Sequence, residues 1–262
     1  MKPNKMRAYD IFGNIALVKF QRGTGANEKR RFAQRIISCN KAIKTVLEKS
    51  GKFKGRLRKQ ETKWIAGEKT KEVLYHENGC VFRFNIDKTY FSPRLSNERK
   101  EIAGKIKKGS EVLVMFAGVG PYPIVIAKNS DAKIIYSNEI NKEANKYAQM
   151  NIEMNKMKNR VVLYEGDIKK VVPKTKQKYD YIVMPRPQLR ESFLKEAFYL
   201  SKKGTIIFYY DFCQDKEKYE IAEKIQNEAK KAKKKIKILK IKTAGEIAPY
   251  KIRVRVDFKV MN

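Results

Sequence analysis

The sequence predicts an α/β protein with a mostly parallel sheet and helices on both of its faces, preceded by a small α+β domain. Two patterns carry this prediction. After roughly residue 95, apolar runs of strand length alternate with helical segments, which is typical of parallel sheets. Before that point, short apolar runs flank one long amphipathic segment. With 262 residues, of which 42% are hydrophobic, the chain can bury a core in one large domain or two modest ones.

Residues 1–90 are expected to form the small domain. Apolar residues such as Phe32, Ile36 and Val46 recur at helical spacing and predict a helix over roughly Glu28–Lys49. The strands of this domain are predicted at Ile15–Phe20, Val73–Tyr75 and Cys80–Ile86.

Residues 91–262 are expected to form the larger domain around a seven-stranded sheet. Its first five strands are predicted at Val112–Phe116, Lys133–Ser137, Val161–Tyr164, Tyr181–Met184 and Thr205–Tyr210. Two more, Lys237–Lys242 and Lys251–Val260, are predicted to close the sheet as an antiparallel hairpin. The last segment alternates polar and apolar residues, which predicts a strand with one face toward water.

The chain is strongly basic, with 60 Lys and Arg residues against 28 Asp and Glu residues and a formal net charge of +32. This excess indicates a polyanionic partner, with nucleic acid favoured over a membrane surface or a compositional bias toward lysine. Balanced ion-pair networks of the kind found in heat-adapted proteins cannot account for it, because the acidic residues are too few to pair with the basic ones. No apolar run approaches the length of a membrane span, and the N-terminal sequence lacks a signal-peptide pattern.

Cysteine and histidine are too few and too scattered for most metal centres. Cys39, Cys80 and Cys213 lie far apart without a CxxC pair, and His76 is the single histidine. A disulfide framework, a cysteine zinc site and a Ser-His triad are therefore not expected. We expect a reduced, soluble, cytoplasmic protein without a metal cofactor.

A glycine turn follows the first strand of the larger domain. The run Phe116-Ala-Gly-Val-Gly-Pro121 ends this strand and leads into a helix. Glycines let the backbone approach a ligand closely, and open α/β sheets bind ligands at the carboxyl ends of their strands. The run lacks a full GxGxxG, so it supports a dinucleotide site only weakly, and a tight turn without a ligand is the alternative.

Two acidic residues stand at the ends of the next two strands. Glu139 lies about twenty residues past the glycines, where an acid can accept hydrogen bonds from the hydroxyls of an adenosine ribose. Asp167 ends the following strand, where it can meet the adenine amino group. Either acid alone could be a helix cap. With the glycine turn, they follow the order of a class I S-adenosylmethionine-dependent methyltransferase with a Rossmann-like fold.

A polar segment that ends at Arg99 precedes the glycine strand. Glu98, beside Arg94 and Arg99, could place a carboxylate at the mouth of the site and take a proton from a base nitrogen. The alternative is structural, because Ser96 and Asn97 could cap the helix that begins near Glu98.

Several motifs together resemble the archaeal tRNA (guanine-37-N1)-methyltransferase family. They run in order over nearly the whole chain: Tyr9-Asp-Ile-Phe-Gly-Asn-Ile-Ala16, His76-Glu-Asn-Gly79, Phe91-Ser-Pro-Arg-Leu-Ser-Asn-Glu-Arg99, Met115-Phe-Ala-Gly-Val-Gly-Pro121 and Ile247-Ala-Pro249 with Asp257-Phe258. The resemblance implies methyl transfer from S-adenosylmethionine to the purine at position 37 of tRNA, next to the anticodon. It also implies that residues 1–90 contact the RNA.

The resemblance assigns residues to the cofactor. Tyr90 would lie near the cofactor or the target base, and Arg99 near the methionine end. Glu139 would hold the ribose and Asp167 the adenine. The whole implied cofactor-binding set is Tyr90, Arg94, Arg99, Phe116, Ala117, Gly118, Val119, Gly120, Glu139, Ile140, Asn141, Asp167 and Ile168.

The implied catalytic residues are Glu98, as general base for the N1 proton, and Arg58, which would stabilise negative charge on the guanine O6. The chain departs from the family in Met184-Pro-Arg-Pro187, because most members have asparagine at the position of Pro185. This Pro-x-Pro form resembles the subgroup that also methylates carbon 7 of 4-demethylwyosine, giving isowyosine. We therefore predict both methylations in tRNA-Phe, with Pro185 and Pro187 at the target base. The alternatives are one of the two reactions alone, or an RNA-binding protein without catalysis.

Many relatives carry an additional N-terminal domain that checks the outer corner of tRNA, and this chain begins almost at their second domain. We therefore expect the chain to hold the anticodon stem-loop largely through its phosphates. We also expect it to be a monomer. Binding to tRNA should weaken steeply between low and moderate salt, because each neutralised phosphate releases counterions. Fluorescence anisotropy of labelled tRNA over a salt series measures this slope, and a nearly flat dependence would contradict the expectation.

Overall fold

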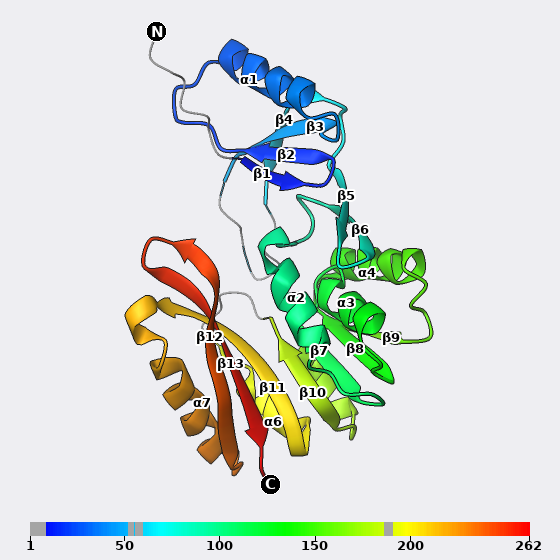
Figure 1. Cartoon of the computed structure of the whole chain (residues 1–262), viewed down its shortest axis with the longest axis vertical. Coiled ribbons are helices and arrows are strands. Elements are labelled where there is room, and N and C mark those ends of the chain that lie inside the picture. Colours follow the sequence, from blue (N-terminus) through cyan, green and yellow to red (C-terminus); the bar gives the residue numbers. More distant parts are fainter. Residues whose placement is uncertain (1–8, 52–54, 56–59, 186–190) are drawn as a thin grey trace. The chain divides into compact units, whose positions relative to one another are not determined.

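The computed structural model describes residues 9–51, 55, 60–185 and 191–262 (Figure 1). They divide into two compact units. The smaller unit takes in the described residues of Met1–Glu77 and Val81–Phe91, and the larger unit consists of Asn78–Cys80 and the described part of Ser92–Asn262. Among the described residues, no helix has both the length and the apolar composition needed to cross a membrane.

The smaller unit is built on a four-stranded sheet with the order β1-β2-β3-β4. Its elements are β1 (Tyr9–Phe12), β2 (Ile15–Val18), α1 (Ala26–Cys39), β3 (Thr45–Lys49), β4 (Thr62–Gly67), β5 (Glu72–Glu77) and β6 (Cys80–Asn85). Helix α1 connects the parallel strands β2 and β3, and Ala33 and Ile36 on its inner face pack against Val18 and Val46 of the sheet. Strands β5 and β6 form a separate two-stranded sheet. The predicted strands of this domain are confirmed, and β1 and β4 were not predicted.

The prediction of one helix over Glu28–Lys49 is wrong in its second half. Helix α1 ends at Cys39, and the Asn40 side chain accepts a hydrogen bond from the Ala42 N–H at 3.0 Å, a local turn that competes with the helix. Residues Thr45–Lys49 then form β3, which lies between β2 and β4. Strand pairing here outweighs the apolar spacing that favoured a helix.

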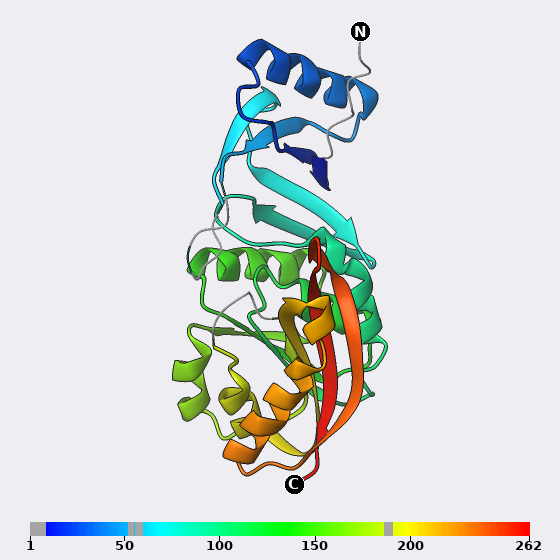
Figure 2. The same ribbon diagram turned by 90° about the vertical axis from the view of Figure 1, so that its left-hand side faces the viewer.

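The larger unit contains a seven-stranded sheet with the order β12-β13-β11-β10-β7-β8-β9. Its strands are β7 (Glu111–Met115), β8 (Ile134–Glu139), β9 (Val161–Glu165), β10 (Tyr179–Met184), β11 (Ser201–Gln214), β12 (Ile236–Ala248) and β13 (Lys251–Val260). The first five of these run parallel, whereas β13 pairs antiparallel with both β11 and β12. The predicted parallel sheet and its closing hairpin are confirmed (Figure 2).

Helices cover both faces of this sheet. They are α2 (Ser96–Ala103), α3 (Pro121–Asn129), α4 (Lys142–Met154), α5 (Ile168–Val171), α6 (Leu194–Tyr199) and α7 (Glu220–Lys231), with short 3-10 helices η1 (Pro93–Leu95), η2 (Val172–Lys174) and η3 (Asp215–Glu217). Leu194 of α6 and Ile225 of α7 share one core cluster with Val254 and Val256 of β13. Helix α2 lies on the other face, where its carboxylates contact Arg255 of β13.

The prediction of one wet face for β13 holds at its two ends, where Lys251, Arg253 and Lys259 are partly exposed, but is wrong in its middle. Its apolar residues, including Val254 and Val256, face the α6 and α7 side. Arg255 and Asp257 point the other way, toward α2, and are 0% and 2% exposed. The middle of the strand is therefore buried on both faces, and the charges of Arg255 and Asp257 are satisfied there by ion pairs rather than by water.

A close backbone approach makes one glycine of the smaller unit sensitive to substitution. Gly13 has φ +54°, and a Cβ atom there would lie 1.8 Å from the carbonyl oxygen of Leu74. We expect Gly13→Ala to lower the free energy of unfolding by at least about 2 kcal/mol, since it adds a backbone clash to left-handed strain. Urea unfolding followed by the fluorescence of the single tryptophan, Trp64 in β4, measures the effect.

Gly23 provides the matched control for this substitution. It has φ +82°, but a Cβ atom there would meet nothing within 4 Å. Gly23→Ala should therefore cost only the conformational strain, about 1 kcal/mol. Equal losses for the two variants would show that the contact with Leu74 does not constrain the fold.

Candidate active site

The glycine turn at the end of β7 adopts a backbone that few residues tolerate. Phe116, Gly118 and Gly120 have φ values of 58°, 58° and 88°, all in the left-handed region. The turn is tied to the next strand because the Ala117 N–H donates to the Asn138 carbonyl at 2.9 Å. Pro121 then begins α3, where a missing N–H costs no hydrogen bond.

Gly120 is closely packed on the side where a side chain would stand. A Cβ atom on it would lie 3.2 Å from Ile124 Cδ1 and 3.6 Å from Ala148 Cβ, so the space is filled by α3 and α4. The turn is also held from α4, since the buried Asn151 amide donates to the Val119 carbonyl at 2.9 Å. These contacts fix the loop at the carboxyl end of β7 before any ligand binds.

Glu139, at the end of β8, contacts the glycine turn directly. Its Oε2 accepts the Gly118 N–H at 2.8 Å and its Oε1 accepts the Asn141 N–H at 2.8 Å. A carboxylate has about four acceptor positions, so the two oxygens retain capacity for hydroxyl donors. Burial raises the pKa of this carboxyl, and the backbone donors limit the rise.

The end of β9 carries the second predicted acid. Asp167 is half-buried and caps α5, where its Oδ1 accepts the Lys169 N–H at 3.1 Å. Ile168 is 2% exposed and belongs to the core cluster on the α6 and α7 face of the sheet. Asn138, which sequence reasoning missed, links the strand ends, since its amide donates to the carbonyls of Tyr164 and Gly166.

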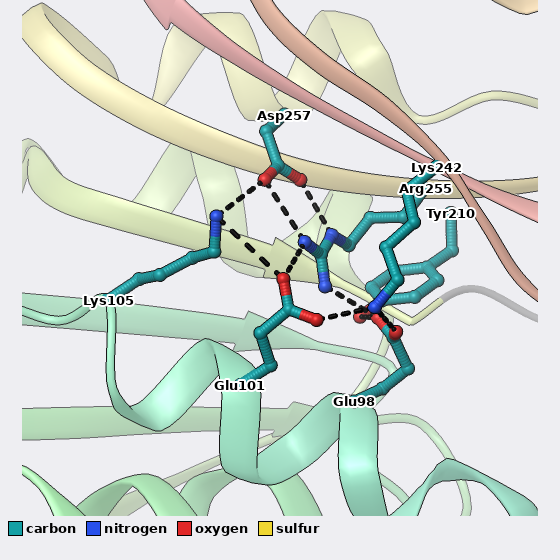
Figure 3. Close-up of polar contacts among 7 residues, drawn as sticks. All are labelled: Glu98, Glu101, Lys105, Tyr210, Lys242, Arg255 and Asp257. Carbon is teal, nitrogen blue, oxygen red and sulfur yellow. Dashed lines mark hydrogen bonds and ion pairs between the residues drawn. The ribbon is translucent and has the colours of Figure 1, made fainter.

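Glu98 lies in the first turn of α2 and is 5% exposed. Its Oε2 accepts hydrogen bonds from Arg255 Nη1 at 2.6 Å and from the Tyr210 hydroxyl at 3.0 Å. Its Oε1 accepts one from Lys242 Nζ at 2.6 Å. Figure 3 shows how three strands, β11, β12 and β13, direct these donors at one carboxylate. Burial raises the pKa of Tyr210 well above its usual value, so its hydroxyl remains a donor.

Arg255 joins this carboxylate to two others. Its Nη2 donates to Glu101 Oε1 at 2.6 Å, and its Nε donates to Asp257 Oδ1 at 2.7 Å. Hydrogen bonding to Arg255 lowers the pKa of Glu101 to about 2, so that carboxyl stays charged. Lys105 completes the group through a 3.2 Å ion pair with Asp257. We call Glu98, Glu101, Lys105, Tyr210, Lys242, Arg255 and Asp257 the α2 ion cluster (Figure 3).

The capping role proposed for Ser96 and Asn97 is not what the structure shows. Both lie inside the first turn of α2, and the preceding residue is Leu95, whose side chain cannot accept an N–H. Glu98 is instead aimed by the α2 ion cluster. Sequence reasoning missed the partners of Glu98 because they come from the C-terminal strands, and the one signal for them was the alternating Arg-Val-Arg-Val-Asp run ending at Asp257.

The remaining predicted residues lie in several places. Arg99 is 1% exposed, donates to the Ser92 carbonyl at 3.0 Å and lies over the Tyr122 ring. Arg94 is exposed in η1, and Pro185 directly follows β10. Ile140 and Asn141 form the link from β8 to α4, and Tyr90 belongs to the smaller unit. Arg58 and Pro187 lie outside the described residues.

The carboxyl ends of β7, β8 and β9 fit an adenosine-containing cofactor. The Glu139 carboxylate is fixed at the glycine turn with acceptor capacity for ribose hydroxyls, and Asp167 ends the neighbouring strand. A nucleoside needs acceptors for its hydroxyl and amino groups, and these two acids supply them.

Comparison with known proteins decides the family. The family described as TRM5/TYW2 methyltransferase domain matches residues 73–239, and the one described as TYW2 N-terminal domain matches residues 3–70. This chain belongs to the TRM5/TYW2 methyltransferase family. A member from Pyrococcus abyssi, tRNA (guanine(37)-N(1))-methyltransferase Trm5b, is 34% identical over 97% of this chain and 74% of its own length.

One further relative and one solved structure bear on the function and the fold. The tRNA (guanine(37)-N(1))/4-demethylwyosine(37)-methyltransferase Taw22 of Nanoarchaeum equitans is 31% identical over 95% of this chain and 98% of its own length. The crystal structure of Pyrococcus abyssi Trm5b has a TM-score of 0.86 at 32% identity, covering 97% of this chain and 75% of that one. The family membership confirms the predicted α/β methyltransferase fold.

The predicted cofactor role of Glu139 can be tested by binding. We expect Glu139→Gln to raise the dissociation constant of S-adenosylhomocysteine roughly tenfold or more, because hydrogen bonds to a charged acceptor contribute about 1.5–3 kcal/mol. Isothermal titration calorimetry measures this change. Glu165→Gln is the control, since Glu165 is exposed and lies opposite Glu139 in the register of β9. Equal affinities of the two variants would remove Glu139 from the cofactor site.

Proposed function

We propose that this chain transfers the methyl group of S-adenosylmethionine to N1 of guanosine-37 and also to carbon 7 of 4-demethylwyosine-37 in tRNA-Phe. Methyl transfer to tRNA is the activity named for its relatives. The observation that carries the proposal is the presence, in one unit, of a fixed glycine turn with Glu139 and a buried, oriented Glu98. Because a single chain supplies these residues, the proposal is for a monomer.

S-adenosylmethionine, when bound, supplies an electrophilic methyl group. The role of the chain is to orient the purine and to accept a proton. When N1 of guanine forms its bond to the methyl carbon, the methyl–sulfur bond breaks and the N1 proton passes to Glu98. At carbon 7 of 4-demethylwyosine the new bond is between two carbons, the methyl–sulfur bond again breaks, and the carbon-7 proton passes to Glu98. Because the transfer depends on alignment, the fixed positions of Arg255 and Tyr210 beside Glu98 contribute directly to rate.

Pro185 supports the second substrate. It directly follows β10 and lacks both an N–H and a side-chain amide. A residue without N–H or amide donors does not select one arrangement of hydrogen-bonding groups on a purine. A residue that hydrogen-bonds one such arrangement rejects purines that lack it. The bifunctional name of the Nanoarchaeum equitans relative supports the same substrate pair.

The proposed RNA partner is tRNA, bound around its anticodon stem-loop. The net charge of +32 supplies the phosphate-binding field. A related structure, the complex of aTrm5 and tRNALeu, is 26% identical with a TM-score of 0.84 over 97% of this chain and 72% of that one.

The three cysteines are free thiols, which a reducing compartment such as the cytoplasm maintains.

Product analysis tests the proposed function. We expect the purified chain with S-adenosylmethionine to convert guanosine-37 in a tRNA-Phe transcript to 1-methylguanosine, and 4-demethylwyosine-37 to isowyosine. Liquid chromatography and mass spectrometry of the digested nucleosides identify both products. Guanosine methylation without isowyosine would contradict dual specificity, and binding of tRNA without any methylation would favour a non-catalytic RNA-binding protein.

A further inference from the structure

The two oxygens of Glu98 have different surroundings. Oε2 is held by Arg255, which is 0% exposed, and by Tyr210, which is 1% exposed. Oε1 is held by Lys242, whose side chain is 32% exposed. One oxygen therefore faces the packed interior of the unit, and the other faces a side chain that reaches solvent.

The contacts on Oε2 cannot open without disturbing the core. Asp257 binds the Arg255 guanidinium at two points, Nε to Oδ1 at 2.7 Å and Nη2 to Oδ2 at 3.2 Å. Such a two-point contact fixes the plane of the guanidinium and so fixes the direction of its Nη1 toward Glu98. Asp257 is itself 2% exposed and forms an ion pair with Lys105, so the carboxylate that holds Arg255 is held in turn.

The contact on Oε1 is of another kind. Lys242 bridges Glu98 and Glu101 from β12, and its ammonium ends a flexible four-carbon stem rather than a rigid fork. Burial opposes its charge, but the hydrogen bonds to Glu101 and Glu98 outweigh burial and raise the pKa of Lys242. The ammonium is thus a cation that covers Oε1 and can swing away while it keeps Glu101 as a partner.

We propose that Oε1 of Glu98 is the oxygen that accepts the purine proton, that Arg255 and Tyr210 are positioning residues that anchor Oε2, and that Lys242 leaves Oε1 when the purine enters. This inference rests on the proposed function, in which Glu98 is the general base. In the step itself, the N–H bond of the purine breaks and a bond forms between the proton and Oε1. Arg255 remains on Oε2 throughout, so the carboxylate does not rotate as it becomes protonated.

We call the contacts of Arg255 and Tyr210 with Oε2 the anchor. It predicts a loss of rate for Tyr210→Phe, which removes one donor from Oε2 and leaves the ring in place. We expect the single-turnover rate at saturating tRNA to fall about tenfold, since small displacements of a reacting group are costly, with unchanged affinity for tRNA and for S-adenosylhomocysteine. Tyr209→Phe is the matched control, because Tyr209 is the neighbouring buried tyrosine and its hydroxyl donates to Asp211 at 2.9 Å. Its rate should equal that of the wild type. Equal rates for both variants would overturn the anchor.

The contact of Lys242 with Oε1 predicts that Lys242→Met changes the single-turnover rate in the opposite direction. Removal of the ammonium uncovers Oε1, so the single-turnover rate at saturating tRNA should exceed that of the wild type. A wild-type rate would mean that Lys242 does not cover Oε1 during turnover. Lys240→Met, on an exposed lysine of the same strand, controls for the loss of one positive charge in tRNA affinity. A rate for Lys242→Met as low as that of Tyr210→Phe would overturn the inference, because Lys242 would then belong to the anchor.

Glu98→Gln separates the failure of this inference from the failure of the proposed function. We expect it to abolish N1 methylation while it keeps the affinity for S-adenosylhomocysteine. Full activity of Glu98→Gln would remove Glu98 as the base, whatever Tyr210 and Lys242 do. Loss of activity in Glu98→Gln, together with wild-type rates in Tyr210→Phe, would leave Glu98 as the base. It would overturn only the assignment of different roles to Oε1 and Oε2. All variants are measured in the full chain, with thermal unfolding recorded to establish that each is folded.

Discussion

The buried guanidinium of Arg255 is the constraint on which the larger unit depends. It is 0% exposed and carries hydrogen bonds to Glu98, Glu101 and Asp257. A buried charge of this kind persists only when it is fully paired, and removing one partner of a buried pair costs about 3–5 kcal/mol. Burial opposes the charge, yet hydrogen bonding to Glu101 and the charge of Asp257 keep the pKa of Arg255 above its ordinary value. The strand that closes the sheet is therefore tied to the helix that carries the proposed base.

The two ends of the candidate site, one proposed for the cofactor and the other for the purine, are built on different principles. The cofactor end uses backbone: a left-handed glycine turn, a strand-end carboxylate that receives its N–H groups, and amide side chains such as Asn151 that hold the loop. The purine end uses side-chain charges from α2, β12 and β13. Backbone contacts suit a ligand that is the same in every cycle. A charged cluster in which the lysine on Glu98, Lys242, is partly exposed suits a site that must admit a bulky base and then exclude water.

Much of the fold could be predicted from the sequence because its signals are local. The apolar run of β7, the glycines after it and the acids at the ends of β8 and β9 are each set by a few neighbouring residues. Thr45–Lys49 could not be recognised as a strand, because its pairing partners in β2 and β4 lie far along the chain. Arg255 and Asp257 were assigned to water for the same reason. Only the packing of α2 against β13, more than 150 positions away in the sequence, turns that polar face into an interior one.

The most direct test of the central claim is the structure of the full chain with S-adenosylhomocysteine and a tRNA-Phe transcript bound. The account requires Arg255 and Tyr210 to remain on Oε2 of Glu98, as they are in the chain alone. It requires Lys242 to have left Oε1, with N1 of guanosine-37 in its place at about 3 Å. A complex in which Lys242 still covers Oε1, or in which N1 faces a different base, would contradict it.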